Sequence, residues 1–280
     1  MSLLKTGKIL INQVLSPLGL EINKIDRGTN TSAYEETHRP KTPRYLNIGA
    51  GSFFHPYWHN LDNPNEYYKN DQKDNLNIQH DLTSRNAIPL EDNSLKVAYT
   101  SHVIEHLNDD DVEFLFSEVY RCLQPGGFFR ITCPDMGLEY DAYLRGDALF
   151  WKWPNAYGVY NTSIEQCFLD HFATALTETH PIKSEQRITN KEIREIFLNL
   201  PKREAFNSII ERVPKDIQKD HYGDHINWFD ADKITEMLRK SKFSKIYESR
   251  YLQSHSPILR NKALFDSTCP ELSLYIECRK

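Results

Sequence analysis

The residues best suited to chemistry near the start of the chain are two glycines followed by an aspartate, between Tyr45 and Asp62. Gly49 and Gly51 follow a short apolar segment, and a turn without side chains lets a ligand approach backbone atoms. Asp62 ends the next segment, a position where an acidic residue commonly binds the hydroxyls of a ribose. A plain tight turn would also explain the glycines, but the spacing to Asp62 favours a nucleoside-binding site.

Three histidines form a second group of residues suited to chemistry. His102 and His106 stand in His-Val-Ile-Glu-His, and His225 precedes a helix predicted to begin near residue 230. A neutral imidazole titrates near pH 7, so each of the three is a candidate general base. We rank His102 first because it follows directly on a predicted strand. A structural histidine bonded to backbone is the alternative for each, and for His106 we favour that alternative.

The same five residues also fit H-x-x-E-H, the signature of one class of zinc peptidases. Histidines four residues apart share a metal in that class where a single helix runs through both. Here a strand is predicted to end at Thr100, and Asn108 with the three aspartates after it is typical of a new helix start. We therefore predict no metal site and keep a zinc hydrolase only as an alternative function.

The elements that must position these residues alternate between strand and helix. Apolar segments predict strands over 45–48, 76–80, 95–100 and 128–133, and one more strand that ends at Asp62. A helix is predicted over 108–123. This alternation favours a mostly parallel sheet covered on both faces. A ligand in such a sheet binds beyond the carboxyl ends of the strands. Four predicted strand ends meet there: Gly49 to Gly51, Asp62, Asp81 to Leu82, and Ser101 to His102.

The stretch from Tyr45 to Asp62 resembles the class I S-adenosylmethionine-dependent methyltransferases. It lacks the third glycine of the dinucleotide fingerprint. Two glycines can suffice in this family, because its cofactor presents a carboxylate and an ammonium in place of a pyrophosphate. Residues 94–135 are similar to the middle of the same family, with Ser-His at a strand end, Glu-His-Leu before the helix and Leu-x-Pro-Gly-Gly before the fifth strand. This second segment is the more specific signal, and the resemblance covers residues 44–135.

The resemblance implies S-adenosylmethionine as the cofactor and gives each strand end a part of it. The methionine part would face Gly49 and Gly51, the ribose Asp62, the adenine Asp81 and Leu82, and the sulfonium region Ser101 and His102. The full set of implied cofactor-binding residues is Asn47, Gly49, Ala50, Gly51, Asp62, Asp81, Leu82, Ser101 and His102. Asn47 stands where the family often has an acidic residue, and its amide oxygen can still accept hydrogen bonds from the ammonium. Asp81 could instead cap the turn before Thr83.

The resemblance also implies an α/β fold: a Rossmann-like, doubly wound, seven-stranded, mostly parallel sheet with an antiparallel C-terminal hairpin strand and a helical cap insertion. Periodicity predicts further helices at 164–176, 190–200, 203–213 and 230–241, and strands at 244–251 and 272–278. We divide the chain into an N-terminal amphipathic helix and linker (1–43), the cofactor-binding core (44–136), the helical cap (137–225) and the C-terminal part of the sheet (226–280).

The composition narrows the class of partner. The chain has 280 residues with a net charge of −5, which argues against a nucleic-acid partner because such a protein needs a basic face. Its five cysteines show no C-x-x-C pair, which predicts reduced thiols and a cytoplasmic location. No apolar run approaches the roughly 18 residues of a membrane span.

Residues 2–20 predict an amphipathic helix with lysines beside its apolar face. Packing on its own domain or on a dimer partner is the favoured interpretation, and the oligomeric state stays open. Weak contact with a membrane surface, which would place the protein at the inner membrane, is the alternative.

The sequence therefore predicts methyl transfer to a small-molecule or sugar-linked acceptor. The preferred acceptor atom is an oxygen of a hydroxyl, phosphate or phosphoramidate, and the resemblance suggests bacterial surface-polysaccharide biosynthesis. Trp151 and Trp153 are either a platform for the acceptor or the core of the cap. Arg130, Arg145 and Arg260 are candidates to hold an anionic group on the acceptor. Besides the zinc hydrolase, a catalytically silent binding protein of the same fold remains an alternative.

Overall fold

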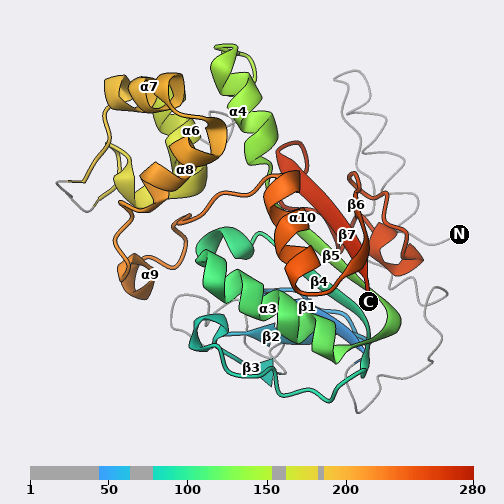
Figure 1. Cartoon of the computed structure of the whole chain (residues 1–280). Helices are drawn as coiled ribbons and strands as arrows, with labels where there is room; N and C mark the ends of the chain where they lie inside the picture. The colour runs from blue at the N-terminus through green and yellow to red at the C-terminus, as the bar shows by residue number, and fades with distance from the viewer. Residues whose placement is uncertain (1–43, 64–77, 153–161, 182–185) are drawn as a thin grey trace, which may run out of the picture.

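The computed structural model describes residues 44–63, 78–152, 162–181 and 186–280 (Figure 1). The expected N-terminal helix and linker, Trp153 and most of the polar stretch after Asp62 lie outside these ranges.

A seven-stranded sheet in the order β3-β2-β1-β4-β5-β7-β6 forms the body of the protein. Its strands are β1 (Tyr45–Ile48), β2 (His59–Asp62), β3 (Ile78–Gln79), β4 (Leu95–Ser101), β5 (Leu123–Pro134), β6 (Ser244–Glu248) and β7 (Ser273–Arg279). The first five strands pair in parallel, and β7 runs antiparallel to both β5 and β6. The predicted fold class is thus confirmed.

The strand order reverses between β1 and β4, which pair through Tyr45–Val97 to Ile48–Thr100. The chain passes from β1 outward to β2 and β3, then returns to the other side of β1. Connections that leave in opposite directions open a crevice above the carboxyl ends of two neighbouring strands. Gly49 follows β1 and His102 follows β4, so the fold brings these two residues to one crevice.

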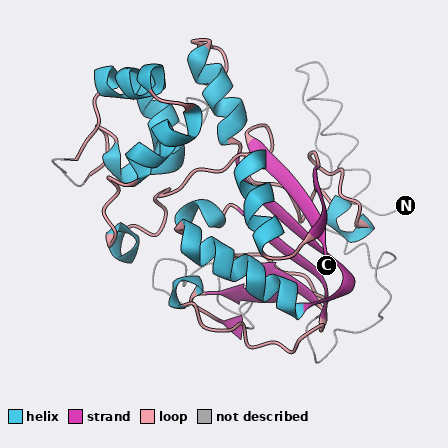
Figure 2. Ribbon diagram, viewed as in Figure 1, coloured by secondary structure: helices cyan, strands magenta, loops and turns pink. Residues whose placement is uncertain are grey.

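Two helices, α3 (Asp109–Cys122) and α10 (Ala231–Lys240), cover one face of the sheet side by side (Figure 2). The side chains of Asn108 and Asp230 cap them by accepting hydrogen bonds from the third backbone N–H of each helix. Their apolar sides bury residues such as Phe116 and Leu238 against the sheet. The opposite face carries an aromatic cluster that includes Trp58, Tyr99 and Phe265.

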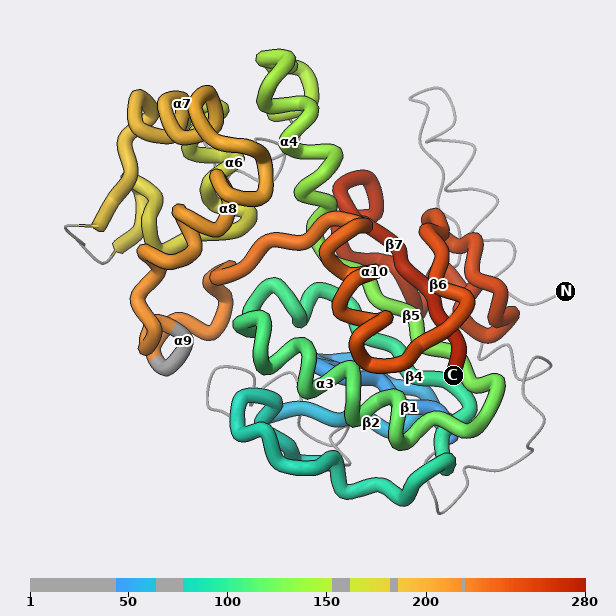
Figure 3. The backbone as a smooth tube through the Cα atoms, in the orientation of Figure 1, coloured from blue at the N-terminus to red at the C-terminus, as the bar shows by residue number. Residues whose placement is uncertain are grey.

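The cap forms a separate helical group to one side of the sheet (Figure 3). Its helices are α4 (Met136–Leu144), α6 (Ile164–Ala173), α7 (Asn190–Asn199), α8 (Lys202–Ile210) and the short α9 (Ile217–Asp220). Phe168, Phe197 and Phe206 pack together at its centre with ring centroids 5.2–5.7 Å apart. Trp151 is 3% exposed and packs on Phe168, so it belongs to the core of the cap.

Several boundaries differ from the sequence prediction. Helix α3 already ends at Cys122, and β5 begins at Leu123 rather than Phe128. The Pro125-Gly-Gly127 segment lies within β5, where the register with β4 jumps from Leu95–Leu123 to Val97–Phe128. β3 covers Ile78 and Gln79 but not His80, and residues 76 and 77 of the predicted strand lie outside the described ranges. A 3-10 turn, Pro257–Arg260, lies in the chain between β6 and β7.

Candidate functional site

The turn after β1 requires its first glycine. Gly49 has a φ of +65°, and a Cβ at this position would lie 2.2 Å from Val103 Cγ2. Its N–H donates to the Leu61 carbonyl over 2.8 Å, which ties the turn to β2. A larger residue would therefore be strained in φ and would push away Val103, which follows His102.

The second glycine leaves space open above the sheet. Gly51 has a φ of +50°, and an added Cβ would meet no atom within 4 Å. Its N–H donates to Asp62 Oδ2 over 2.8 Å, while Asp62 Oδ1 accepts from the N–H of Asn63. The Asp62 carboxylate is thereby fixed beside the glycine turn.

Two cavities open around this turn, and they share Gly49, Gly51 and His102. The first has a volume of about 420 Å³ and is also lined by Asp62, Asp81, Leu82 and His106. The second, of about 740 Å³, is also lined by Asn47, Ala50 and Ser101. All nine predicted cofactor-binding residues thus line one cavity or the other, and volumes of this size accommodate small-molecule ligands.

Asp81 both caps a turn and lines the first cavity. Its Oδ1 caps the turn at Leu82–Ser84 by accepting from both the N–H and the hydroxyl of Thr83, over 2.9 and 2.7 Å. The residue also lines the first cavity. Both hydrogen bonds end on Oδ1, so they hold the carboxylate in place and leave its Oδ2 out of this turn.

His102 stands where the two cavities meet. Its backbone has a φ of +53°, which turns the chain sharply after β4. Its Nδ1 lies 3.1 Å from Glu105 Oε1, and its Nε2 lies 2.8 Å from Ser273 Oγ. Because a carboxylate only accepts, Glu105 favours the tautomer with the proton on Nδ1, and Nε2 then accepts from the Ser273 hydroxyl. This is the arrangement of a base oriented by a carboxylate.

His106 and His225 come together although they are far apart in the sequence. Their rings lie 4.9 Å apart, and the backbone N–H of Ile226 donates to the Glu105 carbonyl over 2.9 Å. Burial of the ring, followed by the neighbouring His106, lowers the pKa of His225 to about 3, so this ring is neutral at pH 7. His106 lines the first cavity, whereas His225 lines neither of the two cavities.

Glu105 is the residue whose role the sequence did not reveal. It is 1% exposed, and its carboxylate lies among the three histidines. Burial alone would raise its pKa, but the hydrogen bond and charge of His102, with His106 and His225, lower the pKa to about 2. Its position inside an H-x-x-E-H pattern was the only available signal.

That pattern does not form a peptidase site here. His102 lies outside any helix, and a short 3-10 turn over Ile104–His106 separates it from α3. The two histidines of the pattern therefore do not stand one above the other on a single helix, which the zinc-peptidase arrangement requires.

The residues present fit a positively charged adenosyl cofactor. The first cavity is lined by the carboxylates Asp62 and Asp81, and the described residues around it include no lysine or arginine. Its floor is bare backbone at Gly49 and Gly51, where a ligand can approach closely. Residues 58–131, which include β2, β4, α3 and most of β5, match the family model described as "Methyltransferase domain".

This segment, residues 58–131 of 280, is thus similar to a methyltransferase domain. The matched segment contains Asp62, Asp81, Ser101 and His102. No curated protein matches the whole sequence significantly.

Several solved methyltransferase structures resemble this chain at low sequence identity. A methyltransferase from Mesorhizobium loti is 15% identical, with a TM-score of 0.42 over 92% of this chain and 100% of the other. A possible histamine N-methyltransferase from Thermotoga maritima is 14% identical, with a TM-score of 0.40 over 85% and 82%. A methyltransferase from Archaeoglobus fulgidus is 13% identical, with a TM-score of 0.39 over 98% of this chain and 94% of the other. None of these three structures is evidence for the methyl acceptor of this chain.

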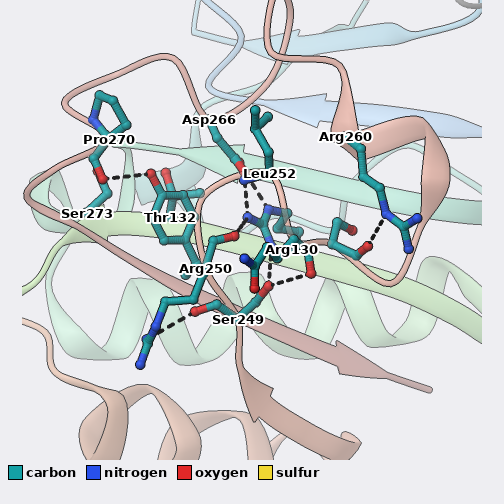
Figure 4. A network of polar contacts seen from close by, with 12 residues as sticks. Arg130, Thr132, Ser249, Arg250, Leu252, Arg260, Asp266, Pro270 and Ser273 are labelled. Carbon is teal, nitrogen blue, oxygen red and sulfur yellow. Dashed lines mark hydrogen bonds and ion pairs between the residues drawn. The ribbon is translucent and has the colours of Figure 1, made fainter.

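The predicted arginines do not line either of these two cavities. Arg130 is fully buried in the sheet and is paired with Asp266 and Glu277, with oxygens 2.5–3.0 Å from its nitrogens (Figure 4). Arg260 donates to the Ser254 carbonyl instead. Within the described part of the chain, no helix is long and apolar enough to span a membrane.

Proposed function

We propose that this methyltransferase moves the methyl group of S-adenosylmethionine to an oxygen of a small-molecule or sugar-linked acceptor. The observation that carries this proposal is the crevice between β1 and β4, where Asp62 and the glycine turn lie on one side and His102 on the other. The proposed cofactor-binding residues are Asn47, Gly49, Ala50, Gly51, Asp62, Asp81, Leu82, Ser101 and His102.

The division of the crevice follows from its two cavities. The cavity with Asp62, Asp81 and Leu82 suits the ribose and adenine, because two carboxylates can accept hydroxyl and amino protons. Asn47 and Ser101 in the second cavity suit the amino-acid end of the cofactor. His102 lines both cavities and so stands next to the reacting carbon in this proposal.

When bound, S-adenosylmethionine supplies a methyl group that is already electrophilic because it is bonded to a positively charged sulfur. The residues of the chain then need to hold an acceptor oxygen in line with the carbon and to exclude water. An acceptor hydroxyl must also lose its proton as the carbon–oxygen bond forms and the carbon–sulfur bond breaks. His102 Nε2 takes that proton in place of its hydrogen bond with Ser273 Oγ, and Glu105 stabilises the resulting imidazolium.

The acceptor class extends the same proposal. Sugar phosphates, nucleotide sugars and phosphoramidates carry oxygens of the required kind, and the resemblance of residues 44–135 suggests a role in bacterial surface-polysaccharide biosynthesis. A cytoplasmic location, with contact at the inner membrane through residues 2–20, belongs to this proposal. The acidic net charge of −5 favours such acceptors over nucleic acid.

The test is a transfer assay with methyl-labelled S-adenosylmethionine and a panel of these acceptors. The expected result is labelled product with at least one sugar-linked or phosphate-bearing acceptor, together with release of S-adenosylhomocysteine. Binding of the cofactor without transfer to any member of the panel would favour the silent binding protein instead. Label found on nitrogen would contradict the choice of an oxygen acceptor.

A further inference from the structure

A group of three side chains beside the crevice has the composition of a metal site. Glu105, His106 and His225 each offer one ligand atom, and the three atoms all lie within 4.8 Å of one another. Two imidazole nitrogens and a carboxylate oxygen are a common ligand set for catalytic zinc and for other divalent first-row metals.

Backbone carbonyls fix both histidines in the form that binds metal. His106 Nδ1 lies 2.8 Å from the Asp224 carbonyl oxygen, and His225 Nδ1 lies 2.9 Å from that of His171. A carbonyl oxygen only accepts, so each Nδ1 carries the proton and each Nε2 keeps its lone pair. This is how metal-binding histidines are commonly held in proteins.

Glu105 supplies an independent observation that points to a cation. Its side chain is 1% exposed, and Oε2 accepts no hydrogen bond from the residues that the structure describes. Oε1 lies 3.1 Å from Nδ1 of His102, a ring that is neutral in the tautomer described above. A metal ion would stabilise this buried carboxylate further and would also occupy the two lone pairs on the neighbouring rings.

We propose that Glu105, His106 and His225 bind a divalent transition-metal ion such as Zn²⁺. This site differs from the zinc-peptidase interpretation of H-x-x-E-H, in which His102 and His106 would bind the metal. Here His225 takes the place of His102. It also revises the sequence prediction of no metal. Three protein ligands leave at least one coordination position open.

The role of the ion rests on the proposed function. His106 lines the first cavity, so an ion bound to it lies at the wall of the crevice. An acceptor hydroxyl on the open position would have a lowered pKa and would attack the methyl carbon more readily. Its proton passes to His102, whose Nδ1 contacts the same carboxylate, and the acceptor oxygen gains the methyl group.

A second group, His180, His221 and Asp224, also has ligand atoms within 4.8 Å of one another. Here His180 Nε2 already lies 3.1 Å from Asp224 Oδ2, so the ring nitrogen and the carboxylate are paired with each other. This group lines neither of the two cavities at the crevice. It is therefore a rival position for the metal that the experiment must separate from the first.

The test measures metal binding directly in the full-length protein. The protein is stripped with a chelator and titrated with Co²⁺, whose visible absorption reports nitrogen and oxygen ligands, and Zn²⁺ is then added as a competitor. We expect one Co²⁺ per chain, displaced by Zn²⁺. Absence of Co²⁺ binding by folded wild-type protein would overturn the proposal.

Three variants locate the ion. Glu105→Gln and His225→Gln should each weaken Co²⁺ binding at least tenfold, in line with the loss of a ligand. His180→Gln, the matched control, should change the affinity less than twofold. Unchanged binding in both ligand variants, or a loss confined to His180→Gln, would overturn the assignment. Far-UV circular dichroism identifies a variant that fails to fold. In that case the other variant and the wild-type titration still decide the result.

Cofactor binding measured in the same samples separates this inference from the proposed function. If the stripped protein binds S-adenosylmethionine and methylates an acceptor at an unchanged rate, the role of the metal is refuted and the function stands. If Co²⁺ binds at the predicted residues while the cofactor does not bind, the site stands and the proposed function is refuted.

Discussion

The backbone N–H of Gly51 donates a 2.8 Å hydrogen bond to Asp62 Oδ2, which joins the turn after β1 to the end of β2. Both residues line the first cavity, and Gly51 lines the second as well. One short contact therefore fixes the two features that the sequence first singled out. The proposed cofactor site depends on their remaining together and accessible.

Replacement of Gly51 tests whether this turn contacts the cofactor. Gly51→Ala should cost about 1 kcal/mol of stability because an alanine is strained at a φ of +50°. It should also weaken S-adenosylmethionine binding at least tenfold, because the added methyl would stand in the crevice. Calorimetry and urea unfolding measure the two effects.

Gly146→Ala is the matched control for that variant. Gly146 has a φ of +61°, with no atom within 4 Å of an added Cβ, and it lies just after α4 in the cap. It should lose a similar stability and keep cofactor affinity within twofold. Equal affinities for the two variants would show that Gly51 does not face the cofactor.

His102→Gln tests the proposed proton acceptor. Because His102 is placed at the reacting carbon and not at the adenosine, the turnover rate should fall about 10²-fold or more, a larger change than that of the cofactor Kd. The rate of the variant should recover at high pH, where a hydroxyl acceptor loses its own proton more readily. A loss that is the same at every pH would leave His102 with a positioning role only.

The buried ion pairs of Arg130 stabilise the fold, so their removal should lower the free energy of unfolding. Arg130→Met leaves Asp266 and Glu277 buried without their cation, which should cost on the order of 3–5 kcal/mol. Arg203→Met removes the exposed pair with Glu236 and should cost much less, because solvent screens exposed charges. Equal losses of unfolding free energy in the two variants, measured with urea, would show that burial of the Arg130 pairs does not matter.

His55 makes stability depend on pH. It is 2% exposed, its Nδ1 accepts from the Tyr57 N–H, and burial lowers its pKa from 6.5 to about 4. The unfolded chain therefore takes up a proton below pH 6.5 that the folded protein takes up only near pH 4. Stability should fall by up to about 3 kcal/mol across this window on acidification.

His55→Gln should flatten that decline by most of this amount, as measured by urea unfolding at several pH values. At pH 8 the ring is neutral in both states, so the pH-dependent difference between variant and wild type should be absent there. A decline of equal steepness in wild type and variant would assign the pH dependence to other groups.

The sequence predicted the sheet well because local patterns determine it. Apolar segments gave β1 and β4, and Asn108 indicated the start of α3. The start of β5 was missed because Pro125-Gly-Gly127 is normally a helix stop, whereas here it forms an irregular part of the strand with a register shift.

The parts of the site that sequence reasoning missed depend on contacts between distant segments. Nothing near Glu105 shows that His225 will lie beside it, since the two meet only through the chain that returns from the cap. Arg130 is similar: its residue type suggested an anion site, but Asp266 and Glu277 arrive from distant segments and neutralise it.

The central claim is that one crevice binds S-adenosylmethionine through the glycine turn and Asp62, and calorimetry of cofactor binding tests it most directly. Wild-type protein should bind one equivalent, and Asp62→Asn should weaken binding at least tenfold, because a carboxylate that can accept from ribose hydroxyls is replaced by an amide. Asp141→Asn, on the exposed side of α4, should bind like wild type. Failure of folded wild-type protein to bind the cofactor, or equal affinity in the two variants, would contradict the account.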